Sequence, residues 1–187
     1  MSFVAELAVM QGDIRMDDIL DKHKQDFNEI RRLCLYCHGL DLTTTRLFSG
    51  SSCAVPSSET KSTLHNMLSG SLLNLAVSIR INFYQDNFEN TLIPLSSLAA
   101  SILIDDDLRY KEVTIKDVCD KIIHADSVTK PITLDEYLDN DVHVSIQFKG
   151  RYKKQNWTMD ICLDLFAEHV LSMLDKLELE NITKEIE

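Results

Sequence analysis

The longest helical pattern in the chain begins at Ser57 or Ser58 and runs to about Tyr84. Its apolar residues recur with the 3.6-residue period of a helix; they are Leu64, Leu68, Leu72, Leu75, Ile79 and Phe83. The second half is apolar on nearly every side, interrupted by Arg80 and Asn82. Because a helix that is apolar all round is normally a buried one, this segment predicts a central helix against which the other elements pack.

A second long helix is predicted upstream, from Asp17 or Asp18 to about Cys37. Gly39 is expected to end it, because glycine is common just past a helix C-terminus. Residues 39–57 are rich in serine, threonine and glycine, a composition typical of a loop. We therefore expect a long loop between the first two helices.

A short amphipathic helix is predicted for Thr114–Ala125. Thr114 with Asp117 three residues later forms a capping-box pattern, which satisfies free N–H groups at a helix start. His124 lies one helical turn beyond Asp120. An acid and an imidazole are therefore expected side by side at the C-terminal end, where the helix dipole attracts positive charge.

After Pro131 the apolar period changes from helical to alternating, as in a half-buried strand. The apolar positions are Val142, Val144, Ile146 and Phe148, followed by Trp157, Met159 and Ile161. Gly150 lies in the turn region between the two runs. We expect a β-hairpin over residues 142–161, which must pack on another surface because isolated hairpins are marginally stable.

The predicted fold class is all-α in the main. A looser helical segment over Leu95–Leu103 and a final helix after Leu163 complete the pattern. The acidic tail, residues 178–187, is expected to fray. The chain is thus predicted to form a single domain over residues 1–187: a bundle of four to five helices with one β-hairpin inserted before the C-terminal helix.

Composition restricts the function classes. The net charge of −11 argues against general affinity for nucleic acid, which requires a basic surface, and favours docking to a basic partner. No run approaches the ~20 apolar residues of a membrane span, and the N-terminus lacks the basic region of a signal peptide. A cytoplasmic protein with reduced cysteines is expected. With five glycines and no glycine-rich phosphate loop, a dinucleotide site is not expected.

Cys34, Cys37 and His38 form a C-x-x-C-H sequence, which is the pattern of c-type haem attachment. The same residues together with Cys53 also have the chemistry of zinc ligands. Both cysteines equally fit the buried stripe of a long helix. We favour this structural interpretation and predict neither a metal site nor a cofactor.

The hairpin turn carries the only basic cluster in the sequence, formed by Lys149, Arg151, Lys153 and Lys154, with Trp157 nearby. Cationic side chains beside aromatic rings can follow a phosphate backbone and stack bases. The alternative is an ordinary solvated turn. These five residues are the candidate RNA-binding set.

The stretch Cys119-Asp120-Lys121-Ile122-Ile123-His124-Ala125 resembles the signature of the HEPN superfamily. That signature is an arginine, commonly followed by a polar residue, then a few residues and a histidine. His124 matches the histidine and Asp120 the polar position, whereas Cys119 stands where the family has arginine. Arg32 and His38 also fit the loose spacing.

The resemblance implies a small helical bundle, often dimeric, that binds or cuts RNA in defence and toxin systems. In such enzymes the histidine moves a proton during attack by the RNA 2′-hydroxyl, and the arginine steadies the phosphate. An acid–base group without this cation would lose most stabilisation of the developing charge. Arg80 on the central helix, or a residue of a second subunit, is the candidate substitute.

Three functions follow. The first is a HEPN-like, catalytically degenerate protein of a phage-defence or toxin–antitoxin type system that binds RNA or a protein partner, as a homodimer or with that partner. The second is an active metal-independent endoribonuclease using His124, Asp120 and Arg80. The third is an acidic interaction module, an antitoxin or inhibitor, that masks a basic partner. Cys119 at the arginine position favours the first over the second.

Overall fold

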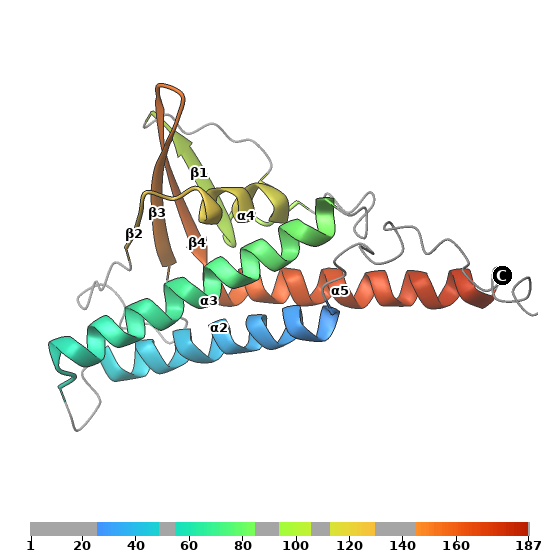
Figure 1. Ribbon diagram of the computed structural model, residues 1–187, viewed down its shortest axis with the longest axis horizontal. Helices are drawn as coiled ribbons and strands as arrows, with labels where there is room; N and C mark the ends of the chain where they lie inside the picture. The colour runs from blue at the N-terminus through green and yellow to red at the C-terminus, as the bar shows by residue number, and fades with distance from the viewer. Residues whose placement is uncertain (1–25, 49–54, 85–93, 106–112, 130–144, 187) are drawn as a thin grey trace, which may run out of the picture.

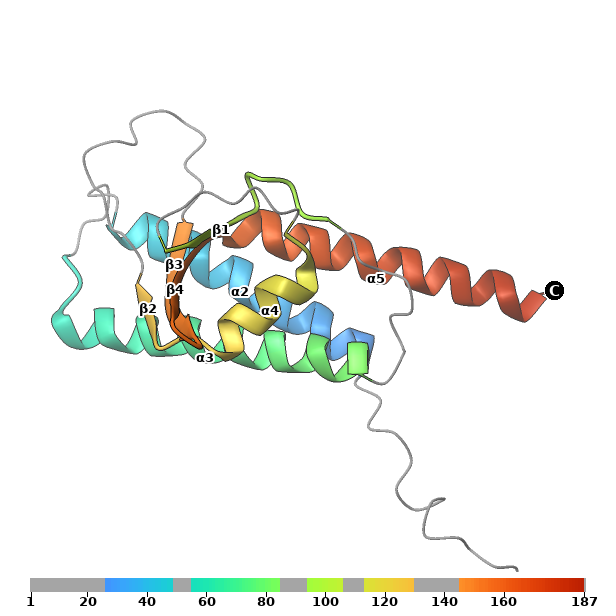
Figure 2. The same ribbon diagram turned by 90° about the horizontal axis from the view of Figure 1, so that it is seen from above.

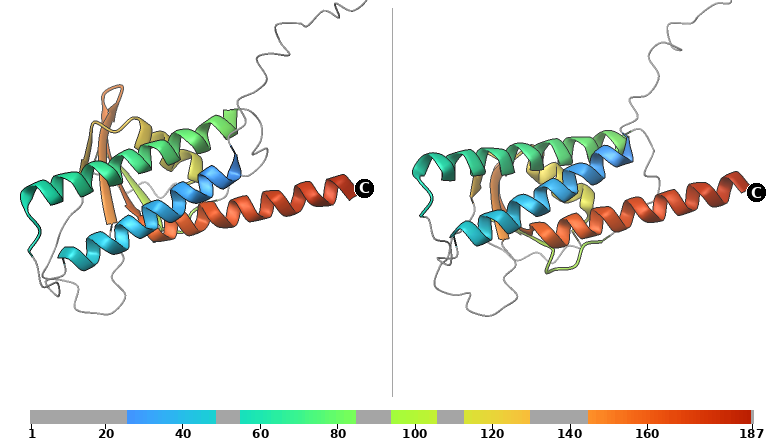
Figure 3. Two further views of the ribbon diagram at one scale, coloured as in Figure 1. Left: turned by 60° about the horizontal axis from the view of Figure 1, so that its bottom comes forward. Right: turned by 90° about the horizontal axis from the view of Figure 1, so that it is seen from below.

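The computed structural model describes residues 26–48, 55–84, 94–105, 113–129 and 145–186. Within these ranges, three long helices form a layer: α2 (Phe27–Phe48), α3 (Ser58–Tyr84) and α5 (Leu163–Ile186). Helix α2 lies between α3 and α5 (Figure 3). The short helix α4 (Ile115–Ile123) and a sheet lie on one side of this layer (Figures 1 and 2). None of the described helices is both long and apolar enough to span a membrane.

The sheet is antiparallel with the strand order β1-β4-β3-β2. Its strands are β1 (Ala100–Ile104), β2 (Ser127–Thr129), β3 (Ser145–Tyr152) and β4 (Gln155–Cys162). Directly opposed residues of β3 and β4 share one face, which is buried: Ile146 with Ile161, Phe148 with Met159, and Gly150 with Trp157. The alternation predicted for the hairpin is confirmed from Ser145 onward, and residues 142–144 lie outside the described ranges.

The predicted all-α fold class is wrong, because the described residues form a mixed α/β fold with four helices and a four-stranded sheet. The main error is the segment Leu95–Leu103, which was expected to be helical. A short apolar run fits a buried strand as well as a helix. Here Ala100, Ile102 and Ile104 alternate toward the buried face, and the whole of β1 pairs with β4.

The second error concerns the end of the first helix. Helix α2 continues through Gly39 to Phe48, so Gly39 is not its stop and residues 39–48 are not a loop. Leu40 and Asp41 continue the buried stripe, and Thr43 Oγ1 donates a hydrogen bond to the Gly39 carbonyl at 2.8 Å. At its start, Asp26 Oδ1 accepts a hydrogen bond from the Asn28 N–H, whereas the predicted start at residues 17–18 lies outside the described ranges.

The predicted helix from Ser58 to Tyr84 is confirmed as α3. Ser57 caps it, because its Oγ accepts a hydrogen bond from the Thr60 N–H at 3.2 Å. Its buried side packs against both α2 and α4. The expectation of burial on every side is wrong for one face, where Leu73 and Val77 are exposed.

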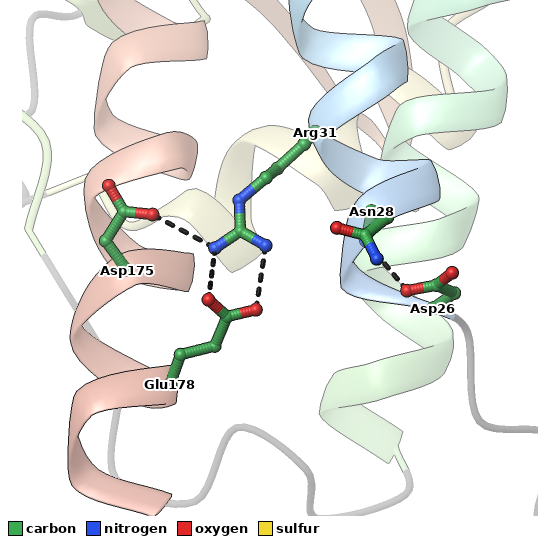
Figure 4. Close-up of polar contacts among 5 residues, drawn as sticks. All are labelled: Asp26, Asn28, Arg31, Asp175 and Glu178. Carbon is green, nitrogen blue, oxygen red and sulfur yellow. Dashed lines mark hydrogen bonds and ion pairs between the residues drawn. The ribbon is translucent and has the colours of Figure 1, made fainter. Parts of the chain in front are cut away.

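An ion-pair cluster joins α2 to α5 (Figure 4). The Arg31 guanidinium donates to both carboxylate oxygens of Glu178 at 2.7 Å and to Asp175 Oδ1 at 3.0 Å, which lowers the pKa of Glu178. Helix α5 reaches Ile186, through the stretch expected to fray. Its C-terminal part extends past the ends of α2 and α3 (Figure 1).

Candidate functional site

Helix α4 has the start and the end that the sequence predicts. The Thr114 hydroxyl accepts a hydrogen bond from the Asp117 N–H, and the Asp117 carboxylate accepts one from the Thr114 N–H, both at 3.1 Å. This is the capping box. His124 ends the helix, with its N–H donating to the Asp120 carbonyl at 3.1 Å. The buried side is formed by Ile115, Val118, Cys119 and Ile122.

Two of the candidate catalytic residues meet in an ion pair. Arg80 Nε lies 2.6 Å from Asp120 Oδ1, and the Arg80 side chain is 8% exposed while that of Asp120 is 39% exposed. Arg80 Nη2 donates to the Tyr84 hydroxyl at 2.8 Å, and the Tyr84 ring centroid lies 4.3 Å from the guanidinium carbon. Among the described residues, Arg80 Nη1 is buried without a hydrogen-bond partner. The guanidinium is therefore held inside the structure by α4.

The third candidate, His124, is exposed. Its ring makes no hydrogen bond or ion pair with any residue in the described ranges, so it does not join the pair of Arg80 with Asp120. Its backbone, however, abuts the hairpin. A Cβ atom built on Gly150 would lie 3.0 Å from the His124 carbonyl oxygen and 2.6 Å from Trp157 Cε2, and the Asp126 N–H donates to the Lys149 carbonyl at 2.8 Å.

This close approach requires glycine at position 150, because any larger residue would collide with the Trp157 ring. Trp157 is 4% exposed, and Lys121 Nζ lies 4.4 Å from the centroid of its ring, within cation–π range. Burial lowers the pKa of Lys121. Trp157 thus joins the sheet to α4 and is not open to a stacking base.

The four basic residues of the candidate RNA-binding set are exposed: Lys149, Arg151, Lys153 and Lys154. We call them the basic hairpin. Successive side chains of a strand point to opposite faces. Gly150 faces α4, so Lys149 and Arg151 point to the opposite face of the sheet. The structure therefore places these two cations away from His124.

The cysteines of the haem-like and zinc-like patterns are core residues. Cys34 and Cys37 are fully buried on α2, and burial raises the pKa of each thiol to about 12. Cys119, at the arginine position of the HEPN pattern, is fully buried as well, and burial likewise raises its pKa. In the described part of the chain, no three His, Cys, Asp or Glu side chains gather as metal ligands. Cys53 lies outside it.

Sequence reasoning missed three contributors to this region. Tyr84 lies four residues after Arg80, a spacing that places two side chains on the same helix face. Gly150 lies opposite Trp157, and this pairing could have been found from the register of the predicted hairpin. Lys121 over Trp157 had no sequence signal, because the contact joins two separate elements. Arg32, of the second loose R-x-H match, is engaged by the Glu29 carboxylate at 2.6 and 2.7 Å.

Comparisons of the chain with known proteins match no protein-family model, no curated protein and no solved structure. The HEPN resemblance therefore rests on the sequence patterns at residues 119–125 and at Arg32 with His38.

We expect Asp120→Ala to lower the free energy of unfolding by about 2–3 kcal/mol. Removing one partner of a buried ion pair costs about 3–5 kcal/mol, and solvent access to Asp120 reduces this. Urea denaturation measures the loss. Asp126→Ala, which removes an exposed carboxylate, is the control and should stay within about 0.5 kcal/mol of wild type. Arg80→Met added to Asp120→Ala should recover part of the loss; equal effects of the two Asp variants would contradict the ion pair.

Burial of Cys34 predicts a specific pH dependence of stability. The thiol ionises near pH 9.0 in the unfolded chain and, with its raised pKa, near pH 12 in the folded one. The unfolded state therefore loses this proton first as the pH rises, so stability is lost across this window. We expect the free energy of unfolding to fall by about 1.4 kcal/mol per pH unit more steeply in wild type than in Cys34→Ala between about pH 9.5 and 11.

Chemical denaturation at several pH values gives both slopes. The cavity that Cys34→Ala creates lowers the free energy of unfolding by the same amount at every pH, so it does not affect the pH slope. The loss of the titrating thiol changes that slope. The effects of the cavity and of the thiol are therefore separable. Identical slopes would show that the Cys34 thiol ionises as easily in the folded protein as in the unfolded chain.

Proposed function

We propose that this protein binds single-stranded RNA through the basic hairpin and does not cut it. The observation that carries the proposal is the concentration of four exposed cations at one end of a hairpin, in a chain of net charge −11. Tyr152, at the same tip, is 63% exposed. Cations that follow a backbone and an exposed ring for stacking are the elements of single-strand binding.

The turn conformation supports a functional reason for Lys153. Lys153 has a backbone φ of 56°, in the left-handed region that costs an ordinary residue about 1 kcal/mol or more. Two-residue hairpin loops favour glycine, asparagine or aspartate at such positions. Strained residues are concentrated at functional sites. Lys153 therefore places a charge at a position where conformation alone would favour another residue.

The environment of Arg80 and the two faces of the sheet both oppose cleavage of a bound RNA. Arg80 is buried and occupied by Asp120 and Tyr84, so it is not free to stabilise a phosphate in a transition state. Lys149 and Arg151 point away from the face on which His124 abuts the hairpin. A phosphate bound by those cations would lie away from His124, the candidate general acid–base.

The cellular setting that the resemblance implies, a phage-defence or toxin–antitoxin type system, remains a prediction of the sequence.

A second candidate function is the acidic module that masks a basic partner, and the net charge of −11 favours it. The two candidates differ in their response to RNA, because an acidic module repels a polyanion.

We expect labelled single-stranded RNA to bind at low salt, with a log–log salt slope of about −3 if all four cations contact phosphates. Lys153→Glu combined with Lys154→Glu should weaken binding at least tenfold and reduce the slope by about 1.4, which corresponds to two lost contacts. Fluorescence anisotropy over a salt series measures both quantities.

Lys116→Glu combined with Lys176→Glu is the matched control, because it changes the net charge equally at two exposed lysines outside the hairpin. It should bind RNA with a slope close to that of wild type. A control that loses as much affinity as the hairpin variant would show that net charge, not this site, governs binding. No RNA binding at about 20 mM salt would reject the proposal and favour the acidic module.

Incubation of the protein with labelled RNA in EDTA is expected to leave the RNA intact over hours, in wild type and in His124→Ala alike. Gel electrophoresis resolves any product. Cleavage by wild type that His124→Ala abolishes would establish the ribonuclease instead, whereas cleavage retained by the variant would indicate a contaminant.

A further inference from the structure

From Thr63 to Val77, one face of α3 is exposed and carries no charged side chain. Between Ser62 and Tyr84 the single charged residue is Arg80, which is buried. Seven exposed residues recur on the opposite, outward face; they are Thr63, Asn66, Met67, Gly70, Leu73, Asn74 and Val77. Helix α3 forms an edge of the three-helix layer (Figure 3). We call these seven residues the α3 face.

The α3 face is nearly symmetric about Gly70. Three residues to either side stand Met67 and Leu73, and four residues to either side stand Asn66 and Asn74. Thr63 and Val77 follow at seven residues, and Ser69 and Ser71 flank the glycine directly. In a two-fold interface, residue i of one copy contacts residue j of the other and the reverse. An antiparallel pair of α3 helices crossing at Gly70 would thus place amide against amide and apolar side chain against apolar side chain.

The surroundings of Gly70 within a single chain give no reason for a glycine at this position. A Cβ atom built on it would meet nothing within 4 Å, and a glycine inside a helix is destabilising relative to alanine. At a helix crossing, a residue without a side chain lets the two backbones approach closely. Gly39 on α2 is equally open, but exposed Arg32 lies seven residues before it.

The net charge of the chain and the absence of charge on the α3 face indicate which partner docks here. Two copies of a chain with net charge −11 repel each other, and new like-charge contacts add least to this repulsion where the meeting surfaces carry no charge. An uncharged face offers no complement to a basic protein or to phosphate. We propose that a second copy of this chain docks here, with α3 antiparallel to α3 and the two-fold axis at Gly70. Residues 63–77 form a strip about 21 Å long and one helix, about 10 Å, wide. Two such strips bury far less than the roughly 1,200 Å² of a stable interface, so the dimer is reversible.

Analytical ultracentrifugation from about 1 to about 300 μM tests this proposal. Wild type should dimerise with increasing concentration. Gly70→Glu should raise the dimer dissociation constant at least tenfold, because the axis would bring two carboxylates together. Gly39→Glu is the matched control, with the same substitution in the same open environment, and should dimerise like wild type. Both variants replace glycine with a better helix former, so both should remain folded by circular dichroism.

The symmetry has its own test. Gly70→Lys alone should be monomeric for the same reason as Gly70→Glu, and an equimolar mixture of the two should recover the dimer. A mixture that stays monomeric, a wild type that is monomeric at every concentration, or a Gly39→Glu variant that dissociates as much as Gly70→Glu would each overturn the proposal. The hairpin lies on other elements, so dimerisation and RNA binding can fail separately.

Discussion

The apolar face of α4 joins the helical layer to the sheet, and both parts depend on that contact. Helix α4 has nine residues, too few to be stable alone in water. Its capping box starts the helix, its buried side packs on α3, and its C-terminal end meets the hairpin at Gly150 and Trp157. A sheet must bury one face against another layer, and here α4 contributes to that layer. The ion pair of Arg80 with Asp120 fixes α4 on α3.

The sequence predicted the elements whose hydrophobic period extends over several turns or strand residues. Helices α3, α4 and α5 and the hairpin belong to this group. Prediction from the sequence failed where the hydrophobic pattern was short or ambiguous. Strand β1 is an apolar run that only its pairing with β4 distinguishes from a helix, and β2 has three residues, too few to show alternation. Gly39 did not end α2, because burial of the apolar Leu40 outweighed the local preference.

The candidate site was predictable in its local geometry and unpredictable in its environment. Spacing along α4 placed Asp120 and His124 one turn apart, and the structure keeps that relation. Spacing could not show that Arg80 would be buried beneath Asp120, or that His124 would be exposed. The direction of Lys149 and Arg151 followed only once Gly150 was placed against α4. A motif read along one helix cannot specify which side chains of other elements converge on it, because convergence is set by tertiary packing.

The setting of Trp157 gives the protein an internal optical probe. It is the chain's one tryptophan, enclosed by the amino group of Lys121 on one element and by Gly150 on another. Its emission spectrum therefore depends on whether the sheet is seated on α4, while circular dichroism is dominated by the three long helices. Comparing the two signals during denaturation distinguishes separation of the two layers from melting of the helices, without any added dye.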